Sequence, residues 1–165
     1  MEPSAASASS APFAPSWQLD ELAAEILDAL GSGGSGDGKV IDGRALAVKA
    51  SPMRENSAKI TVGTAALPPG FSTRPHSHDA EEVAIFLSGS GRVEIDGIAH
   101  PVRRGTVLLT PSGAVHVTMS GPDEPLVVLW FYAPPGSEAR WLEPDKHPTA
   151  GHAGSDTAGG AAARG

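Results

Sequence analysis

Cysteine is absent from this chain of 165 residues, and aromatic side chains make up only 5% of it. Without a thiol, the protein can form neither a disulfide nor a sulfur-ligated metal site. No apolar run approaches the ~20 residues that a transmembrane helix needs. Basic residues are also few: 12 lysines and arginines face 19 aspartates and glutamates, for a formal charge of −7. This charge argues against a surface that binds nucleic acid.

The first ten residues are small and polar, and they lack the basic start and apolar centre of a secretory signal. We therefore expect a soluble, cytoplasmic protein that binds neither nucleic acid nor a membrane. The length predicts one domain with a substantial core. We expect it to be organised as a disordered arm over 1–15, a helix over 16–30, a Gly/Ser linker over 31–38, a β-barrel over 39–142 and a disordered tail over 143–165.

The region after residue 38 has the pattern of a β protein. Short apolar-rich runs alternate with turn signals such as Asp96-Gly97 and Pro111-Ser-Gly113. The runs that we expect to be strands are 44–50, 58–66, 84–87, 92–96, 106–110, 115–119 and 126–132. Many short strands at this spacing are typical of an antiparallel sandwich or barrel.

The expected N-terminal helix begins after Ser16, a candidate N-cap. Its apolar positions follow a period close to 3.6 residues and are Leu19, Leu22, Ile26 and Leu30. This stripe favours a helix packed on the outside of the barrel or on a partner. A lid over the mouth of the barrel is the alternative.

Three histidines and one glutamate form a candidate metal site. His76 and His78 are two residues apart, so both side chains leave the same face of an extended strand. Glu82 returns to that face if a turn or bulge lies between, and His116 follows a Pro-x-Gly turn. A lone His-x-His in a loop is more often an exposed polar segment, but the two further residues favour a metal site. Imidazole and carboxylate together suit Fe, Cu, Ni, Zn and Mn.

These residues resemble the two motifs of the cupin superfamily. The first motif, glycine, His-x-His, glutamate and glycine at fixed spacing, is matched by Gly70, His76, His78, Glu82 and Gly89. The second motif, glycine, Pro-x-Gly, histidine and asparagine, is matched by Gly105, Pro111, Gly113 and His116. Ser120 stands where the family has asparagine, a residue that is not a metal ligand there.

The resemblance covers about residues 40–140 and implies an all-β, single-domain jelly-roll barrel. It implies that His76, His78, Glu82 and His116 bind one divalent transition metal per chain. Fe²⁺ is favoured, and Mn²⁺, Ni²⁺, Co²⁺, Cu²⁺ and Zn²⁺ are the alternatives. The family spacing selects Glu82 rather than Glu81, which would face the other side of the strand.

Strand alternation suggests a pocket beside these ligands. If Glu82 points inward, so does Phe86, and if His116 points inward, so does Thr118. Trp130 and Tyr132 are further candidates, although their run is apolar on both faces and core or a dimer interface is the favoured interpretation.

Four other basic residues have weaker claims to a functional role. Arg74 could reach an anionic substrate at the mouth of the barrel, but such a residue is more often solvated at the rim. His100 precedes Pro101 and is expected in a surface turn. His147 and His152 lie in the expected tail.

Four protein ligands leave two positions of an octahedral metal open to a substrate with adjacent oxygen atoms. We therefore expect a metal-dependent enzyme that acts on a small oxygenated metabolite, most simply a dioxygenase, with Glu82 as its catalytic residue. A metal-assisted isomerase or cyclase of natural-product biosynthesis and a non-catalytic metal- or ligand-binding cupin are the alternatives, because the fold does not choose the reaction. We also expect a homodimer, because residues 127–132 offer more apolar surface than one barrel core needs.

Overall fold

The computed structural model describes residues 15–143, and the expected arm and tail lie almost wholly outside this range. The described chain contains a long helix, α1 (Leu19–Ser32), a short one, α2 (Ala139–Leu142), and a 3-10 turn, η1 (Pro52–Arg54). Its strands are β1 (Gly34–Ser35), β2 (Gly38–Ile41), β3 (Arg44–Ala50), β4 (Thr61–Leu67), β5 (Glu81–Ser88), β6 (Ser90–Ile95), β7 (Ile98–Arg103), β8 (Val107–Thr110), β9 (His116–Ser120) and β10 (Leu126–Ala133).

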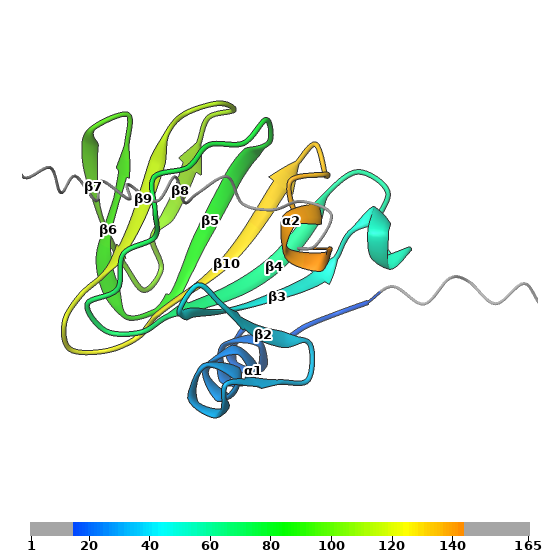
Figure 1. Cartoon of the computed structure of the whole chain (residues 1–165), viewed down its shortest axis with the longest axis horizontal. Helices are drawn as coiled ribbons and strands as arrows, with labels where there is room; N and C mark the ends of the chain where they lie inside the picture. The colour runs from blue at the N-terminus through cyan, green and yellow to red at the C-terminus, as the bar shows by residue number, and fades with distance from the viewer. Residues whose placement is uncertain (1–14, 144–165) are drawn as a thin grey trace, which may run out of the picture.

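The strands form two antiparallel sheets that share one inner core. The large sheet has the order β1-β2-β3-β4-β10-β5-β8, and the small sheet has the order β7-β6-β9. Figure 1 shows the small sheet at the left and the large sheet sweeping away from it to the right. Apolar side chains from both sheets meet in a single cluster between them. The all-β jelly-roll fold expected from the sequence is confirmed.

Strand β10 lies inside the large sheet, between β4 and β5, and it is apolar on both faces because an apolar cluster covers each of them. Its side chains alternate, as the geometry of a strand requires. Val128, Trp130 and Tyr132 enter the inner core. Val127 and Leu129 face the opposite side of the sheet, where they join a second apolar cluster.

Helix α1 covers this outer face of the large sheet (Figure 1). Its buried side chains are Leu22, Ile26 and Ala29, which supports the outside packing that the sequence favoured. The predicted N-cap was wrong by two residues: Gln18, and not Ser16, is the N-cap, and Leu19 is 52% exposed. Because α1 covers the outer side of β10, the apolar run over 127–132 no longer argues for a dimer.

The Gly/Ser-rich segment over 31–38 is not the linker that composition predicted. Its residues end α1, form β1 and begin β2, and this hairpin packs against the helix. A Cβ atom on Gly38 would lie 2.5 Å from the Cβ of Ala29, so glycine permits the close approach of strand and helix. The sequence therefore uses small residues here for packing.

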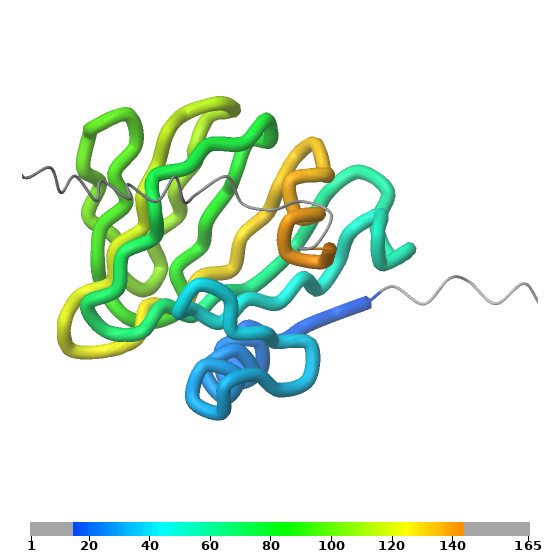
Figure 2. Tube along the Cα trace, in the orientation of Figure 1, coloured from blue at the N-terminus to red at the C-terminus, as the bar shows by residue number. Residues whose placement is uncertain are grey.

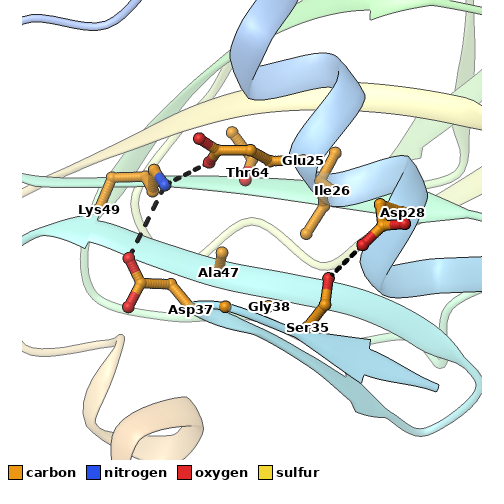
Figure 3. A pocket seen from close by; sticks show the side chains of 10 residues that line it. Glu25, Ile26, Asp28, Ser35, Asp37, Gly38, Ala47, Lys49 and Thr64 are labelled. Carbon is orange, nitrogen blue, oxygen red and sulfur yellow. Dashed lines mark hydrogen bonds and ion pairs between the residues drawn. The ribbon is translucent and has the colours of Figure 1, made fainter. Parts of the chain in front are cut away.

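Ion pairs also hold the helix and the hairpin to β3, as Figure 3 shows. The Nζ atom of Lys49 lies 2.6 Å from a carboxylate oxygen of Glu25 on α1 and 3.8 Å from one of Asp37 in the hairpin. Ser35 donates a hydrogen bond of 2.6 Å to Asp28. The charge of Lys49 is thus matched within the fold.

His100 lies in strand β7, so its placement in a surface turn was wrong. Pro101 does not break this strand because β7 is an edge of the small sheet, where a missing N–H costs no ladder bond. Within the described residues, no helix is long and apolar enough to span a membrane.

The inner core requires a glycine at position 63. A Cβ atom there would lie 2.1 Å from Cζ2 of Trp130, its neighbour on β10. We predict that Gly63→Ala lowers the free energy of unfolding by about 1–3 kcal/mol, since the indole ring must shift in a packed core. Urea unfolding followed by tryptophan fluorescence measures this loss.

Gly31→Ala is the matched control, because no atom lies within 4 Å of the added Cβ. Gly31 lies in the last turn of α1, where alanine is the better helix former, so this variant should be as stable as the wild type or slightly more so. Equal unfolding midpoints for Gly63→Ala and the wild type would show that Trp130 moves without cost.

Candidate metal centre

The two histidine-bearing segments are joined directly through their backbones. The N–H of His116 donates to the carbonyl of His76 at 2.8 Å, and the N–H of His76 donates back at 3.2 Å. Figure 2 shows the segment before β5 rising along β9, where these bonds form. This reciprocal pairing places the two imidazoles on one face, with ring centroids 4.2 Å apart.

Ser120 secures the start of the same segment. Its hydroxyl oxygen accepts a hydrogen bond of 2.9 Å from the N–H of Phe71, and the hydroxyl donates to the carbonyl of Pro68. The serine that replaces the family's asparagine therefore ties the loop to the end of β9. The sequence alone shows only that Ser120 departs from the motif.

Three imidazoles converge between the sheets. Each of His76, His78 and His116 offers a ring nitrogen that lies within 4.8 Å of those of the other two. His78 and His116 are buried, and His76 is half-buried. The ring of Tyr132 packs against His78 with centroids 4.6 Å apart. The three histidines could thus hold a single metal ion, as the sequence predicted.

Backbone carbonyls fix the orientation of all three rings. Nδ1 of His76 lies 2.9 Å from the carbonyl oxygen of Arg74, Nδ1 of His78 lies 2.8 Å from that of Ala80, and Nδ1 of His116 lies 3.0 Å from that of Ala114. A carbonyl only accepts hydrogen bonds, so each Nδ1 carries the proton. In the neutral rings, each Nε2 therefore has a free lone pair, as metal-binding histidines do.

Glu82 completes the group from β5. Its Oε2 atom lies 3.1 Å from Nε2 of His78 and 3.6 Å from Nε2 of His116, and its side chain is 16% exposed. Glu81 is exposed on the other face of the strand. The structure thus places Glu82, and not Glu81, beside the histidines, although its role as a ligand stays a prediction.

These atoms fit a divalent transition metal. Nε2 of His78 and Oε2 of Glu82 are both acceptors when the ring is neutral, so a cation or an added proton must lie between them. Nε2 of His116 is buried and has no hydrogen-bond partner among the described residues. An unsatisfied buried acceptor is costly and calls for an explanation. A metal ion bound by nitrogen and carboxylate donors supplies one.

The charges around the centre set the protonation states of Glu82 and His76 and act in the opposite direction on His116. Burial alone would raise the pKa of Glu82, but His116 and His78 outweigh it and lower this pKa to about 2. Burial lowers the pKa of His76 to about 4, and the charge of His116 contributes. Burial opposes protonation of His116, yet the interaction with Glu82 raises its pKa overall. At neutral pH the carboxylate is therefore ionised and His76 is neutral, as metal binding requires.

A cavity of about 50 Å³ adjoins the centre. Thr118, Trp130 and Tyr132 line it, as the sequence suggested. Two other residues that the sequence suggested for the pocket lie outside this lining. Arg74 is exposed and does not line the cavity. Phe86, 1% exposed, shares the inner face with Glu82 but is enclosed by the core cluster.

The lining also includes residues that the sequence did not mark as pocket residues, among them Arg44 and Trp141. Arg44 is the first residue of the apolar strand β3. A charged residue in an apolar strand is unusual, and this was the one feature of the sequence that could have marked Arg44. Trp141 lies on α2, outside both motifs, where no pattern marked it.

Comparisons with known proteins agree with this picture. The family description "Cupin domain" matches residues 63–132. Dimethylsulfoniopropionate lyase DddW from Ruegeria pomeroyi is 42% identical over 64 residues, which are 39% of this chain and 42% of that protein. The match therefore spans less than half the length of this relative.

Solved structures extend the likeness to the fold. A predicted oxalate decarboxylase from Thermotoga maritima has a TM-score of 0.51 at 25% identity, with 59% of this chain and 84% of that chain covered. KdgF from Halomonas sp. has a TM-score of 0.53 at 17% identity, with 62% and 90% covered, and shows the fold alone. With both motifs, the two-sheet architecture and the histidine cluster in place, the matched region of this chain, residues 63–132, is a domain of the cupin superfamily.

Proposed function

We propose that this cupin is a metal-dependent enzyme that acts on a small oxygenated metabolite. The observation that carries the proposal is the unpartnered Nε2 of His116, buried beside the Nε2 atoms of two further histidines and the carboxylate of Glu82. A purely structural cluster would satisfy that nitrogen within the protein. Perturbed, convergent groups in a cavity are typical of a functional site.

A bound divalent ion would act there as a Lewis acid that polarises an oxygen of the substrate. The protein's own groups orient that substrate. Burial raises the pKa of the Tyr132 hydroxyl, and the charge of Glu82 adds to this, so the hydroxyl stays protonated and can donate a hydrogen bond. The rings of Trp130 and Tyr132, 4.6 Å apart, give the cavity an apolar wall that limits the entry of water.

The names of two relatives favour a reaction that breaks a bond in a small organic acid. DddW is named a lyase of dimethylsulfoniopropionate, and the Thermotoga maritima protein is named a predicted oxalate decarboxylase. We therefore propose a lyase-type reaction as the first candidate. The dioxygenase that the sequence suggested remains the second, because three imidazoles and one carboxylate suit Fe²⁺.

His116→Ala should lower the metal content at least about tenfold, since it removes the most buried of the expected ligands. Elemental analysis after loading with Fe²⁺, Mn²⁺ or Zn²⁺ gives the stoichiometry. His100→Ala is the matched control, because His100 lies on edge strand β7, outside the histidine cluster. Equal metal content in the wild type and His116→Ala would contradict this assignment.

Glu82→Gln should leave a folded barrel that binds metal weakly and turns substrate over roughly 10²-fold more slowly. The substitution keeps the size of the side chain but removes the charge that the two histidines stabilise. Initial rates on a panel of small carboxylates, including oxalate and dimethylsulfoniopropionate, test this. Glu81→Gln, on the exposed face of the same strand, is the control and should turn substrate over at the wild-type rate. Full turnover by Glu82→Gln would contradict the catalytic role of Glu82 and make Glu81 the candidate.

The same assays separate the two candidate reactions. A lyase turns over at equal rates with and without oxygen, whereas a dioxygenase consumes oxygen in step with its substrate. Binding of these compounds without any turnover would instead support the non-catalytic alternative.

We also propose a homodimer, now through a different surface. The outward face of β8, at the edge of the large sheet, exposes Val107 at 63% and Leu109 at 54%. An exposed apolar edge strand favours pairing with a second copy. Light scattering at micromolar concentration should report a dimer that Leu109→Lys converts to a monomer, while Ile98→Lys on the small sheet leaves it intact. A monomeric wild type would refute the proposal.

A further inference from the structure

We propose that Arg44 binds the carboxylate of the substrate, so that the metabolite taken up at this metal centre is a small carboxylic acid. The inference rests on the proposed metal-dependent function and names the substrate class of the same site. It concerns a side chain that neither cupin motif includes.

Arg44 is a buried cation that forms no ion pair among the described residues. Arg44 is only 9% exposed, and it lines the same cavity as His76, Glu82 and His116. Buried arginines are rare without a partner, because a charge removed from water needs compensation. An anion from outside the chain would supply the close partner that Arg44 lacks.

Lys49, on the same strand, shows how this fold treats a cation that has a structural role. Lys49 has carboxylates of Glu25 and Asp37 beside it, as Figure 3 shows. The pocket between α1 and the hairpin therefore presents no free cation to a ligand. Arg44 lies at the other end of β3 and contacts a ring instead: its Cζ atom lies 5.1 Å from the ring centroid of Trp141.

A second guanidinium strengthens the positive character of this wall. The Cζ atom of Arg140 lies 5.0 Å from the same ring of Trp141. Burial lowers the pKa of Arg44; the charge of Asp42 opposes this effect, and the charge of Arg140 adds to it. The two guanidinium groups beside the indole of Trp141 repel each other, and a bound anion would reduce this repulsion. A carboxylate at this position relieves both burial and repulsion.

Geometry and size restrict what that anion is. A guanidinium presents a planar fork that matches the two oxygens of a carboxylate. The cavity, at about 50 Å³, has room for one or two waters, each of which occupies about 30 Å³ in the liquid. This space favours an acid of about two carbons, with a second oxygen directed to the histidine side, and side chains must still move to admit it.

The test uses the full-length protein and two probes of nearly equal size, glycolate and its uncharged analogue glycolamide. Calorimetric titration of the metal-loaded wild type should show tighter binding of glycolate. Arg44→Met, which keeps an apolar contact for Trp141, should weaken glycolate about 10- to 100-fold, the range expected for a charge-assisted hydrogen bond, and leave glycolamide unchanged. Arg103→Met, on exposed edge strand β7, is the control and should bind both probes as the wild type does.

Elemental analysis of the same samples separates this inference from the proposed function. If the wild type holds no metal, the metal-dependent function fails, yet metal-free protein should still prefer glycolate through Arg44. Should Arg44→Met not fold, Arg44→Lys keeps the charge without the fork and should show an intermediate loss. Equal affinity of the wild type for both probes, wild-type affinity in Arg44→Met, or loss of the preference in Arg74→Met would each overturn the inference.

Discussion

The reciprocal backbone hydrogen bonds between His76 and His116 are the constraint on which this centre depends. They join the irregular segment before β5 to β9 in one register, and a slip of one residue would turn one imidazole to the opposite face. The carbonyls that orient the rings belong to Arg74, Ala80 and Ala114, which lie within two residues of the histidines they contact. Ring direction and protonation are therefore set by local backbone geometry. The remainder of the barrel has to bring the two segments together.

The convergence of His76, His78, Glu82 and His116 could be predicted from the sequence because their spacing reflects strand geometry. His76 and His78 share a face by the two-residue period, and the same period separates Glu82 from Glu81. The inner and outer sides of β10 could not be assigned in this way, because a strand buried on both faces has no polar residue to mark the parity. That assignment needed the position of α1, which covers one side of the large sheet.

The failed predictions share a cause: local composition was outweighed by contacts distant in the chain. Gly38 looks like part of a flexible linker, but it is small because the Cβ of Ala29 approaches it closely. Pro101 suggests a turn, yet an edge strand tolerates it. Arg44 begins an apolar strand and offers no periodic signal, so only the folded molecule reveals the histidine-lined cavity beside it. Propensity describes a segment alone, whereas these residues are fitted to neighbours that the segment does not contain.

The electrostatics of the cavity connect the metal centre with Arg44. On one side, the lone pairs of three Nε2 atoms and the ionised Glu82 require a cation, because buried acceptors that face one another are unfavourable. On the other side, a buried guanidinium requires an anion. Glu82 does not neutralise Arg44 within the fold. It lies beside His78 and His116 and forms no ion pair with Arg44 among the described residues. A metal ion together with an organic acid would satisfy both demands at once. The unmatched groups on the two sides then have a common explanation: the fold leaves open the positions that the metal and its substrate complete.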